Sequence, residues 1–142
     1  MSAAEVTRLP ITSDVQIAGA RQAVRGAAVE AGFGLVEQTK LVTAASELAR
    51  NTLVHGGGGE MELVIVGGPG GRGIRLTFTD HGPGIPDVSA ALSDGYTTGN
   101  GLGLGLGGAR RLVQDFTIES TPGGGTTVTV VSWSRAGQRV SR

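Results

Sequence analysis

The sequence contains no cysteine among its 142 residues, so no disulfide can stabilise its core. A chain of this length buries about two thirds of its unfolded surface on folding and needs no such cross-link. It also has no apolar run near the roughly 18 residues of a membrane helix, and its first residues lack the pattern of a signal peptide. These absences predict a soluble, cytoplasmic, single-domain protein that does not contact a membrane.

The sequence has few aromatic residues and no excess of charge of one sign. Aromatics make up 4% of the chain, and 12 basic residues balance 12 acidic ones. Proteins that hold nucleic acid usually carry a basic surface, often with aromatic side chains on which bases stack. We therefore expect no nucleic-acid partner.

Glycine, in contrast, is abundant, with 26 of 142 residues against a usual share of about 7%. The glycines cluster at 56–59, 67–73, 82–84, 95–108 and 123–125. Apolar segments separate the clusters, which excludes a disordered low-complexity chain. Turns are sufficient to explain the clusters at 67–73 and 123–125.

The apolar periodicity predicts the regular elements. A first strand over 6–11 precedes a helix that Ser13 or Asp14 can cap, and a second helix runs over about 36–54. Their packed stripes comprise Ile17, Ala20, Val24, Ala27, Ala28 and Ala31 in the first helix, and Leu41, Ala44, Ala45, Leu48 and Thr52 in the second. Strands over 61–66 and 74–79 follow, joined by a glycine turn.

The rest of the chain begins with a long connection over 81 to about 108, which is too long for a plain loop and resembles a lid. A third helix is expected after it, with Ala109, Leu112, Val113 and Phe116 on one face, then strands over 116–120 and 126–133. This order predicts an α+β two-layer sandwich: a mixed, mostly antiparallel sheet with helices on one face. One domain would span 1–134, followed by a polar tail over 135–142.

The first motif pairs Glu47 with Asn51, which lie one turn apart on the second helix and off its apolar stripe. A carboxylate and an amide oxygen side by side suit a Mg²⁺ ion that keeps most of its waters and also holds phosphates. Without further motifs, such a pair more often belongs to the polar, solvent-exposed face of a helix.

The second motif is Asp80-His81-Gly82-Pro83-Gly84-Ile85, directly after a strand. A carboxylate at a strand end can accept a hydrogen bond from an exocyclic amine such as that of adenine. Gly82 and Gly84 let the backbone turn sharply and approach a ligand. A simple Asp-Gly turn is the alternative, but a long loop follows here in place of a returning strand.

The third motif is the run from Gly99 to Gly108, in which glycine alternates with leucine before a helix. Free N–H groups at such a helix start attract anions, and a triphosphate is the natural ligand. No Gly-Lys-Ser/Thr follows, which excludes a P-loop. A flexible linker, the remaining alternative, rarely continues into an amphipathic helix.

The three motifs in this order resemble the GHKL superfamily of ATPases and kinases, which has the Bergerat ATP-binding fold. Nearly the whole chain is similar to the RsbT-type switch serine/threonine kinases of bacterial stress signalling, through GFGLVEQTKLVTAASELARN, DHGPGIPD, DGYTTGNGLGLGLGGARRLVQDFTIES and GTTVTVVSW. The chain departs from that family at His81, where an amide residue is usual, and in the Gly-Leu character of its lid.

The resemblance implies ATP and Mg²⁺ as cofactors and a role for each motif residue. Asn51 would be the Mg²⁺ ligand, and Glu47 would be the catalytic residue that orients the attacking hydroxyl. Asp80 would bind the adenine amine with Thr126 in support, and Gly82, Gly84 and Ile85 would shape the pocket. The phosphates would be wrapped by Gly101, Gly103 and Gly105.

The resemblance also implies partners. The substrate would be a serine or threonine of a STAS-domain antagonist, and the kinase would activate a PP2C-type phosphatase by binding it. One alternative is an anti-sigma factor kinase, which would bind a sigma factor and phosphorylate an anti-anti-sigma factor. Another is a non-catalytic module that uses ATP only to set its shape, although the intact Glu47 argues against it. A detached histidine kinase domain or a gyrase-like ATPase is disfavoured, because no phospho-acceptor hairpin or transducer domain accompanies the motifs.

Overall fold

The computed structural model describes residues 6–68, 71–93 and 105–134 of the chain. Within these ranges the strands are β1 (Val6–Ile11), β2 (Gly59–Gly68), β3 (Gly71–Asp80), β4 (Asp115–Thr121) and β5 (Gly125–Trp133). The helices are α1 (Asp14–Glu30), α2 (Leu35–Val54), α3 (Val88–Leu92) and α4 (Gly105–Arg111). The tail predicted over 135–142 lies outside the described residues.

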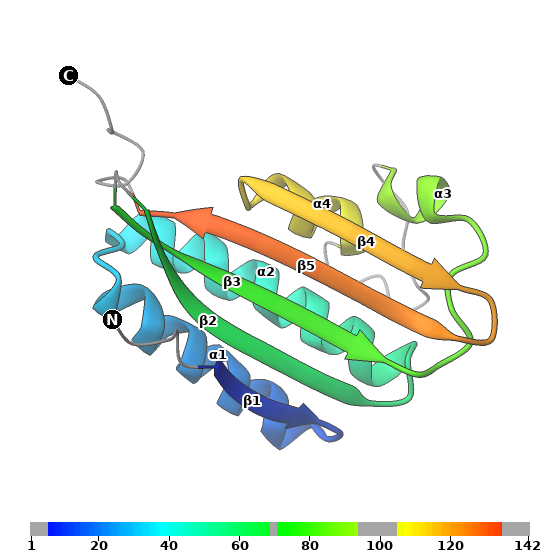
Figure 1. Ribbon diagram of the computed structural model, residues 1–142. Coiled ribbons are helices and arrows are strands. Elements are labelled where there is room, and N and C mark those ends of the chain that lie inside the picture. Colours follow the sequence, from blue (N-terminus) through cyan, green and yellow to red (C-terminus); the bar gives the residue numbers. More distant parts are fainter. Residues whose placement is uncertain (1–5, 69–70, 94–104, 135–142) are drawn as a thin grey trace.

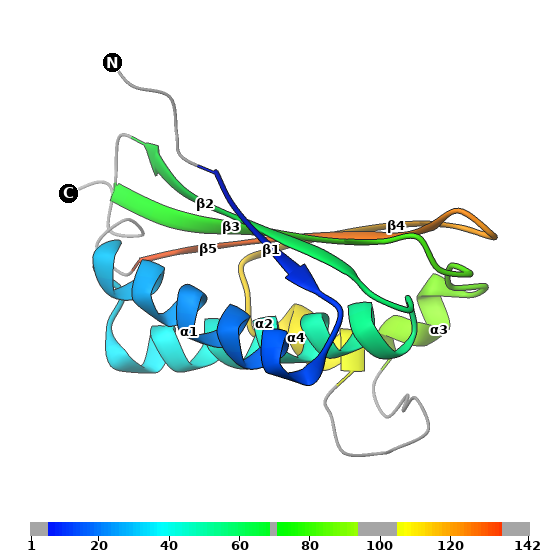
Figure 2. The ribbon, with the colours of Figure 1, turned by 90° about the horizontal axis from the view of Figure 1, so that it is seen from below.

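The strands form one sheet in the order β1-β2-β3-β5-β4, and every pairing between these described strands is antiparallel. Figure 1 shows the sheet in front of α1 and α2, and Figure 2 shows all the helices beneath a single layer of strands. The predicted α+β two-layer sandwich with helices on one face is therefore confirmed, whereas the sheet predicted to be mixed is antiparallel throughout the described strands.

The core lies between the sheet and the helices. All the residues predicted for the two helix stripes are buried, including Val24 and Ala44, whose exposed fraction is 0%. Strand residues such as Phe78 and Leu76 cover these stripes from the sheet side. The 3.6-residue period of each helix and the two-residue period of each strand account for this match, because each element turns one apolar face inward.

The prediction was wrong about the third helix, which begins earlier and ends sooner than expected. The helix α4 starts within the glycine run at Gly105 and ends at Arg111, while Phe116 belongs to β4. Packing explains the early start: Leu106 is buried, and a Cβ on Gly107 would overlap the carbonyl oxygen of Leu92 in α3. The short helix α3, inside the predicted lid, was not foreseen.

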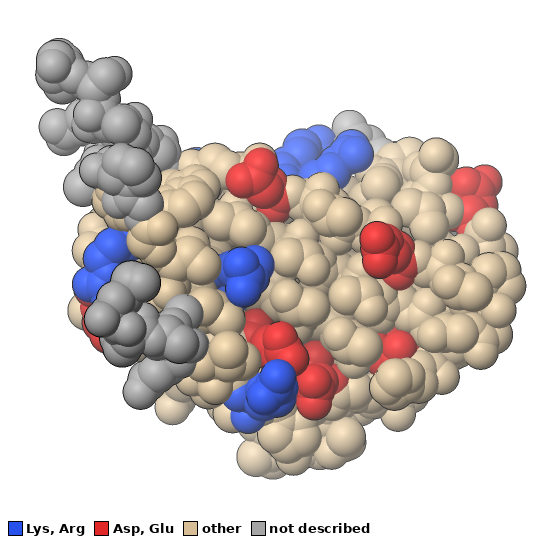
Figure 3. Space-filling view, in the orientation of Figure 1, with Lys and Arg blue, Asp and Glu red and all other residues tan. Residues whose placement is uncertain are grey.

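The sheet face turned away from the helices is open. A row of register partners across β3, β5 and β4 places Thr77, Thr129 and Thr117 on this face. Figure 3 shows this face, on which acidic and basic side chains are scattered singly or in small groups over a largely uncharged surface. In the described ranges no helix has the length and apolar character of a membrane span.

Candidate functional site

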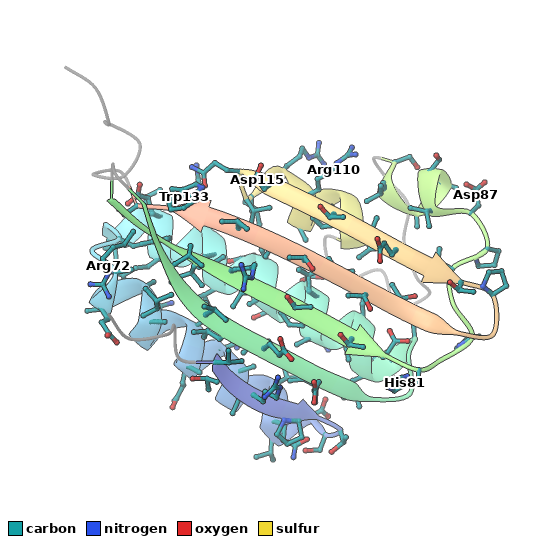
Figure 4. The ribbon with its side chains drawn as sticks, in the orientation of Figure 1. Arg72, His81, Asp87, Arg110, Asp115 and Trp133 are labelled. Carbon is teal, nitrogen blue, oxygen red and sulfur yellow. The ribbon has the colours of Figure 1, made fainter. Side chains whose placement is uncertain are left out.

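A cavity of about 180 Å³ lies between α2, the inner face of the sheet and the loop after β3. Its lining combines apolar walls with a few polar side chains: Leu48, Asn51, Thr52, His55, Phe78, Asp80, Pro83, Gly84, Ile85, Ala91, Leu106, Thr126 and Val128. Whole small ligands usually occupy about 300–1,000 Å³, so this volume suits one flat ring system. The cavity is at the end of the sheet where Figure 4 labels His81, opposite the end that carries Arg72 and Trp133.

Asp80 is the last residue of β3, and the residue as a whole is 9% exposed. Its Oδ1 atom accepts hydrogen bonds from the backbone N–H of Gly82 at 2.9 Å and of Thr126 at 3.3 Å. Among the described residues no hydrogen bond reaches Oδ2. The carboxylate is thus held through one oxygen, and the other can accept a hydrogen bond from a ligand in the cavity.

The loop that follows Asp80 is attached to the turn between β4 and β5. Gly84 has a φ of 82°, and a Cβ at this position would overlap the carbonyl oxygen of Thr121. The Gly123 N–H donates to the carbonyl of Pro83 at 2.8 Å, and the Ile85 N–H donates to Ser120 Oγ at 2.7 Å. The loop therefore closes one side of the cavity with a backbone conformation that favours glycine.

The wall opposite this loop belongs to α2, and Asn51 lines the cavity from there. Its Nδ2 atom is buried and has no hydrogen-bond partner among the residues that the structure describes. A buried amide without a partner costs about 1–3 kcal/mol, and native structures rarely retain one unless a ligand or water satisfies it. The unpaired amide of Asn51 can thus bind a polar ligand group or a water in the cavity.

Glu47 lies one turn before Asn51 but does not line the cavity. It is half-buried, and its Oε1 atom accepts a 3.4 Å hydrogen bond from the backbone N–H of Gly105, the first residue of α4. Glu47 therefore lies outside the cavity, where α2 contacts the first residue of α4. Of the glycines predicted to wrap phosphates, Gly101 and Gly103 lie outside the described residues.

The structure thus brings the predicted residues Asn51, Asp80, Gly84, Ile85 and Thr126 to one cavity. The predicted Gly82 adjoins it through its hydrogen bond to Asp80. No group of three or more His, Cys, Asp or Glu side chains that could hold a metal is found in the described part of the chain.

Two residues that contact Asp80 or Thr126 from outside the cavity lining were not predicted, Gly56 and Ser120. Gly56, which begins the glycine cluster at 56–59, lies against the carboxylate of Asp80. The Oγ atom of Ser120 lies 2.9 Å from the hydroxyl oxygen of Thr126. The order of the motifs carries no signal for either residue, because the Gly56 contact depends on how the end of α2 packs on β3 and the Ser120 contact depends on the register of β4 with β5.

Comparison with known proteins agrees with the fold and with the family that the motifs resemble. Residues 36–135 match the family of histidine kinase-, DNA gyrase B- and HSP90-like ATPases. The chain is 41% identical over 125 residues to the serine/threonine-protein kinase RsbT of Bacillus subtilis (strain 168), which covers 88% of this chain and 94% of RsbT. It is 30% identical over 129 residues to the anti-sigma F factor of Pasteuria penetrans, which covers 86% of this chain and 85% of that protein.

A solved structure gives the same picture of the fold. The crystal structure of the RsbU and RsbW domains of Rv1364c from Mycobacterium tuberculosis matches 93% of this chain with a TM-score of 0.62 and 21% sequence identity. The match covers 32% of that longer chain and, at this identity, supports the architecture alone. From the family match and the identity to RsbT, the chain belongs to the histidine kinase-, DNA gyrase B- and HSP90-like ATPases, in the group that contains RsbT.

Proposed function

We propose that this protein is an ATP-dependent serine/threonine protein kinase that acts on another protein. The observation that carries the proposal is the cavity in which the free Oδ2 of Asp80 and the unpaired amide of Asn51 are brought together. The 41% identity to a serine/threonine-protein kinase supports the same activity. Each end of the cavity suits a different part of ATP.

The Asp80 end suits the adenine ring. Oδ2 would accept a hydrogen bond from the 6-amino group, which only a base with a donor at that position offers. Apolar side chains, among them Leu48, Ile85 and Val128, line the same cavity and would cover the faces of the ring. Burial of the flat ring against them would supply most of the affinity, and the hydrogen bond would supply the selectivity.

The Asn51 end suits phosphate and Mg²⁺. The buried Nδ2 lacks an acceptor, which a phosphate oxygen would provide, and the amide oxygen would be the protein ligand of Mg²⁺. Mg²⁺ commonly keeps several waters and takes only one or two protein ligands beside the phosphates of its nucleotide, so the residues present fit it. When bound, it would neutralise phosphate charge during transfer. Gly101, Gly103 and Gly105 would wrap the phosphates.

Glu47 is the residue proposed for catalysis. The serine or threonine hydroxyl oxygen of the substrate protein would form a bond to the γ-phosphorus, and the bond from that phosphorus to the β–γ bridging oxygen would break. The hydroxyl proton would pass to the Glu47 carboxylate, and ADP would leave. The hydrogen bond from Gly105 to Glu47 would hold the carboxylate at the junction of α2 and α4.

The partners proposed are those that the RsbT-type resemblance implies. A STAS-domain protein would supply the serine or threonine, and a PP2C-type phosphatase would be activated by binding the kinase, in the cytoplasm. The similarity to anti-sigma F factors favours a second candidate, in which the chain binds a sigma factor and phosphorylates an anti-anti-sigma factor. A module that binds ATP without transferring phosphate is the outcome to exclude.

The test is a transfer assay with the purified full chain. Mg-ATP labelled at the γ-phosphate is incubated with the protein and with candidate STAS-domain proteins, and phosphoserine and phosphothreonine are identified after hydrolysis. Transfer by the wild type but not by Asp80→Asn prepared in the same way would support the kinase and exclude a contaminating one. Binding of ATP without transfer to any candidate would favour the binding module. Pull-down with a sigma factor, compared with pull-down with the phosphatase, separates the two kinase candidates.

A further inference from the structure

Three residues form a row across three adjacent strands on the inner face of the sheet. Asp80 of β3 is the register partner of Thr126 of β5, and Thr126 is the register partner of Ser120 of β4. Asp80 and Thr126 line the cavity, and Ser120 lies behind Thr126, half-buried. Side chains in such a row are close neighbours, so a hydroxyl in the third position can act on the second.

The Ser120 hydroxyl has three polar neighbours. The Ile85 N–H lies 2.7 Å away, the Thr126 hydroxyl oxygen 2.9 Å away, and the Gly125 carbonyl oxygen 3.4 Å away. An amide N–H can only donate, so Ser120 accepts from Ile85 and has one proton to donate elsewhere. O–H···O bonds are usually 2.5–3.0 Å long, which favours Thr126 over Gly125 as its acceptor.

The contact between the two hydroxyl groups can run in either direction, and the direction in which Ser120 donates determines the role of Thr126. In that arrangement the proton of Thr126 itself is free to point into the cavity that this residue lines. The cavity then presents an acceptor, Asp80 Oδ2, next to a donor, the Thr126 hydroxyl. Adenine carries the complementary pair, a 6-amino donor beside the N1 acceptor, whereas guanine carries O6 and N1–H in the opposite sense.

We propose that Ser120 is a positioning residue that sets base selectivity: it orients the Thr126 hydroxyl as a donor to N1 of the adenine ring. The inference rests on the proposed function, because it assumes that the cavity takes the base of ATP. Ser120 does not touch the base, so its effect on the N1 contact passes through Thr126. If Thr126 donated its proton to Ser120 instead, only lone pairs of the Thr126 oxygen would face the cavity, and N1 would receive no hydrogen bond.

The test compares ATP with two analogues, each lacking one of the two groups. In 1-deaza-ATP a C–H replaces N1 and the 6-amino group remains, and in purine riboside triphosphate the 6-amino group is absent and N1 remains. Titration calorimetry gives the affinity of the wild type, Ser120→Ala and Thr126→Val for each. The wild type should prefer ATP to 1-deaza-ATP by about threefold to tenfold, the usual effect of one neutral hydrogen bond.

The variants separate the role of Ser120 from that of Asp80. In Ser120→Ala the preference for ATP over 1-deaza-ATP should fall, because the Thr126 hydroxyl keeps its proton but is no longer oriented toward N1, while the preference for ATP over purine riboside triphosphate should stay at the wild-type value. The double variant Ser120→Ala, Thr126→Val should lose no more of the N1 preference than Thr126→Val alone, because the two residues act through one contact. Thr117→Ala, an exposed change on the other face of β4, is the matched control and should keep both preferences.

The outcomes distinguish this inference from the proposed function. A wild type that binds no ATP refutes both. A wild type that binds ATP and 1-deaza-ATP equally, or a Ser120→Ala protein with the full N1 preference, refutes only the role of Ser120. If Ser120→Ala fails to fold, Ser120→Cys fills the same space with a weak S–H donor, and it should show a reduced N1 preference. An unreduced preference in that variant overturns the inference as well.

Discussion

The carboxylate of Asp80 lies directly against the Cα of Gly56, at the end of α2, and a Cβ at position 56 would come within 2.5 Å of Asp80 Oδ2. The two residues are 24 positions apart: Gly56 lies in the connection between α2 and β2, and Asp80 is the last residue of β3. Two backbone N–H groups hold Oδ1 of Asp80, so the carboxylate has a fixed orientation. A side chain at position 56 would overlap this carboxylate, and glycine avoids the overlap. This contact and the site around it lead to four predictions.

Replacing Gly56 with alanine should weaken ATP binding. The φ of Gly56 is not positive, so alanine can adopt its backbone, and the effect arises from the overlap of the new methyl group with Asp80. Displacing the carboxylate removes a hydrogen bond worth about 1.5–3 kcal/mol, which is roughly tenfold to a hundredfold in affinity. Calorimetry with Mg-ATP measures it. Gly19→Ala, with open space around its Cβ on α1, should bind ATP normally, and wild-type affinity in a folded Gly56→Ala protein would contradict the prediction.

Asp80→Asn should change which base is bound. The N–H groups of Gly82 and Thr126 require an acceptor at Oδ1, so the asparagine carbonyl will take that position and its NH₂ group will replace Oδ2. A donor then faces the 6-amino group of adenine, and ATP affinity should fall roughly tenfold to a hundredfold. Affinity for ITP, which has a 6-oxo acceptor, should fall less. Competition binding measures the ratio of the two affinities, and an unchanged ratio would mean that Oδ2 does not contact position 6.

Asn51→Ala should remove Mg-ATP binding without destabilising the protein that is free of nucleotide. Its buried Nδ2 makes no hydrogen bond to the described part of the chain, so truncation relieves a desolvation cost of about 1–3 kcal/mol that offsets the lost packing. The urea midpoint without nucleotide should therefore stay close to the wild-type value, while the increase in Tm on adding Mg-ATP should disappear. Thr43→Ala, also half-buried on α2 but outside the cavity lining, should keep that increase. A large loss of stability with retained ATP binding would assign Asn51 a purely structural role.

Glu47→Gln should separate binding from transfer. Glutamine keeps the shape and an oxygen that can accept the Gly105 N–H, so Mg-ATP affinity should remain near that of the wild type. Loss of the base should slow phosphate transfer by about 10²–10⁴-fold, a typical contribution of general-base catalysis. Some transfer should remain, because phosphoryl transfer depends strongly on positioning and charge neutralisation. Single-turnover assays measure it, with Glu119→Gln on the open face of the sheet as the control. A wild-type rate in Glu47→Gln would exclude a catalytic role.

The helix α4 illustrates where prediction from local sequence failed. Glycine is among the poorest helix formers, with a cost of about 1 kcal/mol per residue relative to alanine, so the local sequence places the helix start after Gly108. The structure begins it at Gly105, because burial of Leu106 and Ala109 against the rest of the core outweighs the poor propensity. The absence of a side chain at Gly107 permits the close approach to α3.

The sequence by itself determined the elements and the order of the motifs. Helical and strand periods are local properties, so they sufficed to identify the buried stripes of α1 and α2, the strand before Asp80, and the position of Glu47 one turn from Asn51. Helix geometry alone fixes that last relationship, since residues four apart share a face.

Only the tertiary structure decided which side chains meet in the cavity. The contact of Gly56 with Asp80 depends on how the end of α2 packs on β3, and the row from Asp80 through Thr126 to Ser120 depends on the register of three strands. A shift of one residue in that register would turn the side chains of a strand to the opposite face, and the three side chains would no longer be neighbours. Pairing between segments far apart in the chain is set by the packing of the whole core, and for this reason the sequence revealed the motif residues but not the residues that hold them in position.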